Sequence, residues 1–224
     1  MLTELELLRL VEAGENQHVE FKRLVHSPEK IAKSISAFAN SAGGTILIGV
    51  DDDKRIVGIE SEKETAEIVW EAATQFVQPA APIETEVAEF RGRDVLAVLV
   101  QESDRKPHYH LSQTRDPKTF KKITERKAYV RQGDKNIVAA PEAVALMKAE
   151  HRPVRISFGE NERMLMNYLN AYHRITLREF SRLVNISDRR ASRILVSLVR
   201  AGVIHLHTEG KQCFYTLKHL AVSA

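Results

Sequence analysis

The sequence has a single cysteine, Cys213, among its 224 residues. One cysteine excludes an internal disulfide and a cysteine-rich zinc site. No apolar run approaches the roughly 20 residues that a membrane-spanning helix needs, and the first residues lack the basic segment and apolar core of a secretory signal. Because 43% of the residues are hydrophobic and 28% are charged, we expect a globular cytoplasmic protein that makes no membrane contact.

The chain also lacks the phosphate-binding loop of the common ATPases. That loop requires the pattern Gly-x-x-x-x-Gly-Lys-Ser/Thr, in which backbone amides and the lysine hold the phosphates. The glycine pair in Gly43-Gly44-Thr45 has neither this spacing nor the lysine. ATP hydrolysis is therefore not expected, and a helix end followed by a turn is the favoured interpretation of the two glycines.

Acidic residues are scarce in the last third of the chain. Residues 151–224 contain 12 Lys and Arg but five Asp and Glu, a net charge of +7. The first 150 residues hold 21 basic and 25 acidic residues, a net charge of −4. Such a division of charge indicates that the C-terminal part contacts a polyanion, although a basic solvated surface would give the same count.

Several short motifs follow one another in a distinctive order in the first part of the chain. They are a Glu-Phe-Lys strand, a helix ending Ala-Phe-Ala-Asn before the glycine pair, an Ile-Gly-Val strand with acidic residues behind it, and Val-Gly-Ile, at 20–22, 37–44, 48–53 and 57–59. Lys-Pro-His-Tyr and Tyr-Val-Arg-Gln-Gly follow at 106–109 and 129–133. This order resembles the Schlafen AlbA-like family from about Glu15 to Val144. The resemblance implies a mixed α/β domain that binds DNA.

Hydrophobic spacing and turn residues predict alternating helices and strands in this first part. Helices are expected at 2–13, from Pro28 through Phe38, at 61–77 with Trp70 facing inward, and from Pro141 to about 151. Hairpins are expected to join 45–50 with 55–59 and 83–90 with 95–101, and two shorter strands surround His108 and Tyr129. We therefore expect an α+β protein with a first domain at 1–150 and a second at 151–224.

The pattern changes after His151-Arg152-Pro153. Helices are predicted at 160–172, 177–184 and 188–201, followed by strands at 203–207 and 213–217. Three helices and a two-stranded ribbon in this order are typical of a winged helix-turn-helix, which places the last helix in the DNA major groove. A module of this kind that serves only for protein contacts is the alternative.

The predicted recognition helix carries arginines on its outer face. Arginine bonds guanine through two donors or grips a phosphate as a fork. The turn predicted between the last two strands contains a glycine and a lysine, and this lysine would contact the DNA backbone or the minor groove. The predicted DNA-binding residues are Ser187, Arg189, Arg190, Ser192, Arg193 and Lys211.

A second group of basic residues precedes and includes the Tyr-Val-Arg motif. Several lysines and arginines together could neutralise phosphates, so that binding would weaken steeply with salt. A solvated charged loop is an equal alternative, and the arginine of the motif could instead pair with a carboxylate. The candidate contacts are Lys121, Lys122, Arg126, Lys127 and Arg131.

The resemblance also implies an alternative function, because some Schlafen proteins are similar to metal-dependent RNA endonucleases. Two glutamates five residues apart and a later aspartate would hold a divalent metal. Glu15 and Glu20 have this spacing, one of Asp51, Asp52 and Asp53 would be the third ligand, and Lys22 would stabilise charge on the phosphate. The alternative to a metal site is that Glu20 and Lys22 belong to a half-exposed strand and that residues 51–53 form an ordinary turn. The cysteines of the Schlafen zinc site are missing here.

The favoured function is thus a DNA-binding transcriptional regulator without catalysis and without a cofactor; a divalent metal enters only with the nuclease alternative. DNA is the expected partner, and RNA and a second copy of the chain remain open. A third hypothesis is a sensor whose first domain binds a ligand near Gly43-Gly44 or Asp51. His108 and His110 have the spacing of a metal pair but no third ligand, and surface histidines are the simpler interpretation.

Overall fold

A computed structural model describes residues 2–115, 122–150, 153–154, 158–209 and 212–218. The chain forms two compact units, Met1–Ala139 and Ala140–Ala224. No helix in the described part of the chain is long and apolar enough to cross a membrane.

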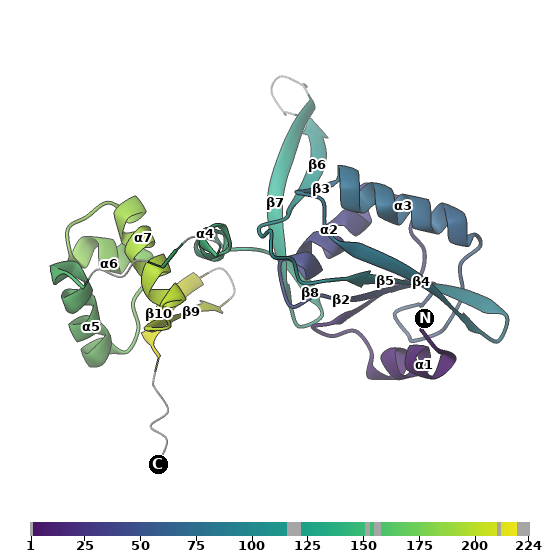
Figure 1. The fold of residues 1–224 in the computed structure, drawn as a ribbon, viewed down its shortest axis with the longest axis horizontal. Helices are drawn as coiled ribbons and strands as arrows, with labels where there is room; N and C mark the ends of the chain where they lie inside the picture. Colours follow the sequence, from purple (N-terminus) through teal and green to yellow (C-terminus); the bar gives the residue numbers. More distant parts are fainter. Residues whose placement is uncertain (1, 116–121, 151–152, 155–157, 210–211, 219–224) are drawn as a thin grey trace, which may run out of the picture. The chain divides into compact units, whose positions relative to one another are not determined.

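A mixed four-stranded sheet forms the centre of the first unit (Figure 1). Its order is β1 (Val19–Lys22), β2 (Gly44–Ile48), β5 (Arg93–Val100) and β4 (Ile83–Phe90). The β1–β2 pair is parallel, and the other two pairs are antiparallel. The predicted hairpin of 83–90 with the following strand is confirmed.

Helices cover both faces of this sheet. The helices α2 (Pro28–Ala39) and α3 (Glu62–Gln75) pack on one face against Ile46, Ile48 and their neighbours, while α1 (Glu4–Ala13) packs on the other face against Leu47 and Phe21. Because strand side chains alternate, the segments 46–48 of β2 and 95–100 of β5 must carry apolar side chains toward both layers. This explains the continuous apolar runs in these two strands.

A second, antiparallel sheet is built from β3 (Val77–Gln78), β6 (Tyr109–Arg115), β7 (Lys122–Gln132) and β8 (Lys135–Val138). The strands β6 and β7 form a ribbon that projects beyond the first sheet (Figure 1). The sequence predicted only two shorter strands here, because exposed ribbons lack the apolar alternation of a half-buried strand.

Two local predictions in the first unit are wrong. Residues 45–50 and 55–59 do not form a hairpin, because β2 already pairs with β1 and β5, and one bridge, Val50 to Ile56, joins the two segments. The Gly49 carbonyl instead accepts the backbone N–H groups of Val57 and Gly58. Trp70 is 46% exposed and does not face the core.

The second unit contains α4 (Pro141–Ala149), α5 (Glu160–Tyr172), α6 (Leu177–Leu183) and α7 (Asp188–Arg200), then the hairpin β9 (Ile204–Glu209) and β10 (Gln212–Leu217). Its core is separate and centres on Leu165, Phe180 and Leu195. Ile175 pairs with Tyr215 and adds a single bridge beside the hairpin. This arrangement is consistent with a winged helix, and the expected α+β class is confirmed. The helix α4, which was expected in the first domain, belongs to the second unit and packs against α7.

Candidate nucleic-acid interface

The turn before α7 and the N-terminal cap of the helix fix where α7 begins. Asn185 adopts a left-handed conformation with φ of 52°, which asparagine tolerates better than most residues. The hydroxyl of Ser187 then accepts a hydrogen bond from the backbone N–H of Arg190 and caps the helix. Ala191, Leu195 and Leu198 are buried, so the remaining face of the helix is turned to solvent.

Three arginines occupy that outer face. Arg189, Arg190 and Arg193 are all exposed. Arg193 follows Arg190 by three residues and Arg189 by four, so it is a neighbour of both on the helix surface. None of the three forms an ion pair with another described residue. Ser192 is half-buried beside them. The first half of α7 thus presents guanidinium groups that no carboxylate of the described chain neutralises.

The wing contributes histidines to the second unit's surface. His205 and His207 are exposed on β9, and the ring of His207 stacks on Phe214 with centroids 5.1 Å apart. His207 Nε2 lies 2.9 Å from Thr216 Oγ1. Lys211, predicted to act at the wing tip, lies outside the described residues.

Sequence reasoning missed a second row of arginines. Arg178 and Arg182 are exposed on α6 with an i, i+4 spacing, and Arg174 is exposed just before this helix. The first helix of a helix-turn-helix crosses the DNA backbone, so these residues could reach phosphates. Arg174, Arg178 and Arg182 are each four residues apart, and this spacing is the sequence signal that could have identified the row.

In the first unit, the predicted basic cluster is only partly described. The guanidinium of Arg126 lies over the Tyr109 ring, 4.6 Å from its centroid, and both Arg126 and Lys127 are exposed. Lys127 pairs with Glu125 at 2.6 Å, which reduces the local positive charge. Lys122 begins β7, and Lys121 lies outside the described residues.

The expectation that Arg131 contacts nucleic acid is wrong, because its side chain is completely buried. Its guanidinium donates to Glu20 Oε2 at 2.7 Å and to Asn136 Oδ1 at 2.9 Å. It also stacks over the Phe38 ring at 4.5 Å. Arg131 therefore pairs with a carboxylate, the alternative that the sequence left open.

The partners of Glu20 show that this carboxylate belongs to the same buried network. Ser34 Oγ donates to it at 2.6 Å, and the Lys22 ammonium lies 2.6 Å away. Burial favours a raised pKa for Glu20, but the charge of Lys22 and the hydrogen bonds from Lys22, Ser34 and Asn136 outweigh burial and hold the pKa below its ordinary value. Glu20 is thus an ionised structural carboxylate.

The nuclease residues are not assembled into a metal site. Glu15 accepts a hydrogen bond from the Phe21 amide at 2.8 Å, and Asp51 pairs with Arg23 at 3.0 Å. Across the described ranges, no three His, Cys, Asp or Glu side chains are grouped so that they could hold a metal ion. The Glu15, Glu20 and Asp51 triad with Lys22 is therefore not supported by this geometry.

The Ala-Phe-Ala-Asn motif has a structural explanation. The side chain of Asn40 donates to the carbonyls of His108 and Tyr129 at 2.8 and 2.9 Å and accepts from the His108 amide at 2.7 Å. Gly43 follows with φ of 71°, and its amide bonds the Phe38 carbonyl. A Cβ on Gly44 would lie 2.4 Å from the Phe38 ring. The motif ends α2 and attaches it to the second sheet.

The remaining histidine and cysteine candidates are also held by the fold. His108 is fully buried with Nδ1 2.7 Å from the Pro79 carbonyl, and burial lowers its pKa. His110 Nε2 lies 2.8 Å from the Glu29 carbonyl, so neither histidine is the surface residue that the sequence suggested. Burial likewise raises the pKa of the Cys213 thiol, which keeps it protonated at neutral pH.

These features define a protein with an α+β first unit followed by helices and a β-hairpin. The model of the family described as Schlafen, AlbA_2 matches residues 15–140, and the chain belongs to this family. The resemblance seen in the sequence is thus confirmed. The family is associated with DNA binding and with transcriptional regulators.

Two solved structures are similar to this chain. The N-terminal domain of a RecG-related protein from Nitrosomonas europaea is 27% identical over 49% of this chain and 81% of its own, with a TM-score of 0.43. The DIP2311 protein from Corynebacterium diphtheriae is 14% identical over 96% of this chain, with a TM-score of 0.45. This chain covers 39% of the DIP2311 protein.

Proposed function

We propose that the protein is a DNA-binding transcriptional regulator that contacts duplex DNA through α7. The observation that carries this proposal is the exposed arginine face of Arg189, Arg190 and Arg193, which no described carboxylate neutralises. Arginine at the start of a recognition helix can read guanine in the major groove or bind phosphates.

The charge distribution supports the same proposal. The net charge of +7 in residues 151–224 would raise the local concentration of a polyanion near this part of the chain. Arg178 and Arg182 on α6 are proposed to contact phosphates, and Lys211 of the wing is proposed as a further contact. Such contacts position the protein on DNA, while the base contacts of α7 select the sequence.

The experiment compares the wild type with the triple variant Arg189→Ala, Arg190→Ala and Arg193→Ala in anisotropy titrations with duplex DNA. Each phosphate contact contributes about 0.9 to the slope of log K against log salt. We expect the variant to bind at least tenfold more weakly and its slope to fall by about 2 to 3 if most of these arginines touch phosphates.

A charge-matched control separates this effect from net charge. Arg9, Lys63 and Arg105 are exposed residues of the first unit, and their joint change to alanine removes the same charge. This control should bind like the wild type. An α7 variant that keeps wild-type affinity and slope would reject α7 as the recognition helix. Parallel titrations with single-stranded DNA and RNA determine which nucleic acid is preferred.

A further inference from the structure

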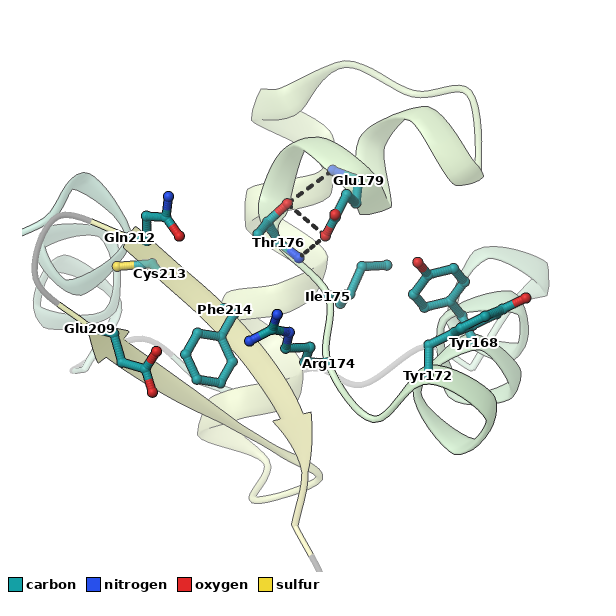
Figure 2. A pocket seen from close by; sticks show the side chains of 10 residues that line it. All are labelled: Tyr168, Tyr172, Arg174, Ile175, Thr176, Glu179, Glu209, Gln212, Cys213 and Phe214. Carbon is teal, nitrogen blue, oxygen red and sulfur yellow. Dashed lines mark hydrogen bonds between the residues drawn. The ribbon is translucent and has the colours of Figure 1, made fainter.

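A pocket of about 300 Å³ opens in the second unit between the end of α5 and the hairpin (Figure 2). We call it the wing pocket. Tyr168 and Tyr172 stand on one side and Glu209, Gln212 and Cys213 on the other, with Arg174, Ile175 and Phe214 between them. Its volume is at the lower end of the roughly 300–1,000 Å³ typical of small-molecule sites.

Three of the residues that line the wing pocket are aromatic, namely Tyr168, Tyr172 and Phe214. The rings of Tyr168 and Tyr172 lie 4.5 Å apart at an angle of 35°, and Tyr172 is 65% exposed. The guanidinium of Arg174 lies over the Phe214 ring, 5.8 Å from its centroid. Rings and guanidinium planes are the surfaces on which flat heterocycles stack. The walls therefore favour a planar ligand.

The charged groups limit what that ligand can be. Arg174 supplies one positive charge, and Glu179 and Glu209 supply two negative charges. The carboxylate of Glu179 accepts from the backbone and hydroxyl of Thr176, at 2.8 and 2.9 Å, which fixes it at the rim. The two carboxylates repel a polyphosphate, and the guanidinium repels an organic cation. An uncharged ligand is repelled by neither.

The polar groups also match the edge of a nucleobase. The Arg174 guanidinium only donates hydrogen bonds, the Glu209 carboxylate only accepts them, and the Gln212 amide does both. A base presents ring acceptors beside amino or imino donors on one planar edge. We propose that the wing pocket binds an uncharged nucleobase, supplied either by a free nucleoside or by an unpaired position of a nucleic-acid strand.

This site is independent of the DNA contact proposed for α7. The arginines of α7 do not line the wing pocket. The triple alanine variant of α7 should therefore keep nucleobase binding, and Tyr172→Ala, which removes no charge, should keep the duplex-binding slope with salt. The failure of one proposal can thus be distinguished from the failure of the other.

The test uses the full chain and calorimetric titrations with guanosine, adenosine, cytidine and uridine. At least one nucleoside should bind, and its affinity should fall about tenfold or more in Tyr172→Ala and in Arg174→Ala. Tyr172→Phe keeps the ring and should bind like the wild type. Both residues are exposed, so their replacement should leave the fold intact, which thermal unfolding checks.

Two further ligands distinguish the sources and the alternatives. If the base comes from a strand, a single-stranded oligonucleotide should bind more tightly than the same oligonucleotide with abasic positions, and Tyr172→Ala should abolish the difference. The proposal is overturned if neither nucleosides nor unpaired bases bind, if binding survives both alanine changes, or if benzyltrimethylammonium binds more tightly than every nucleoside.

Discussion

At the scale of single residues, two motifs far apart in the sequence form one buried ion pair. Glu20 belongs to the Glu-Phe-Lys strand and Arg131 to the Tyr-Val-Arg segment, and their contact joins β1 to β7. Asn136 of β8 donates to the same carboxylate at 3.0 Å. Both motifs therefore serve the fold, because removing the Glu20 charge would leave the buried Arg131 without an ionised partner, whereas Glu20 also pairs with Lys22.

The first prediction concerns Glu20→Gln. The substitution keeps the shape of the side chain but removes the charge opposite Arg131, so the first unit should lose about 3 kcal/mol or more of its free energy of unfolding at pH 7. Urea unfolding followed by the fluorescence of Trp70, the single tryptophan, measures this loss in the first unit. Glu71→Gln, at an exposed position of α3, should change stability by less than about 0.5 kcal/mol.

The stability difference between the wild type and Glu20→Gln should also depend on pH. The pKa of Glu20 in the folded protein lies below its ordinary value of 4.5, so the stabilisation is complete above that value and is lost as the pH falls through the folded-state pKa. The difference between wild type and Glu20→Gln should therefore shrink in acid below about pH 4.5. A difference that stayed constant into strong acid would contradict this role for the charge.

At the scale of elements, α7 combines a cap, a buried face and a charged face within a few residues. The Ser187 hydroxyl caps the turn that carries Arg189 and Arg190. Ser187→Ala should lower the stability of the second unit by about 1 kcal/mol, measured by far-ultraviolet circular dichroism during unfolding.

Ser187→Asp is the matched control for the cap. Aspartate caps helices as well as serine, so stability should return to that of the wild type. Its negative charge beside the proposed phosphate contacts should nevertheless weaken duplex binding. Equal affinities of Ser187→Asp and wild type for duplex DNA would argue against a phosphate path at the start of α7.

The elements also show what the sequence can predict. The helix 160–172 was predicted with its observed bounds, and α7 with its cap, because amphipathic spacing and capping are local signals. The partner of Arg131, 111 residues away, had no such signal. The β2 pairing failed for the same reason, since its partners β1 and β5 depend on the whole chain. Of the candidate site, the exposure of α7 was foreseen and the wing pocket was not.

At the scale of the whole molecule, the chain has separate hydrophobic cores. Residues of the first unit alone form the two clusters around its central sheet, and residues of the second unit alone form the cluster around Leu195. Folding cooperativity depends on shared buried surface, so we infer that each unit unfolds as its own cooperative element.

Leu195→Ala tests this inference. Leu195 is fully buried in the second unit, so its truncation should cost that unit about 2–5 kcal/mol. Circular dichroism should show the helices of the second unit melting earlier, whereas the transition reported by Trp70 of the first unit should keep its midpoint. Leu96→Ala, at a position buried to 1% exposure in the first unit, is the reciprocal variant and should shift only the Trp70 transition. Because the substitutions lie in different cores, equal shifts of both transitions in either variant would show that the two units unfold together.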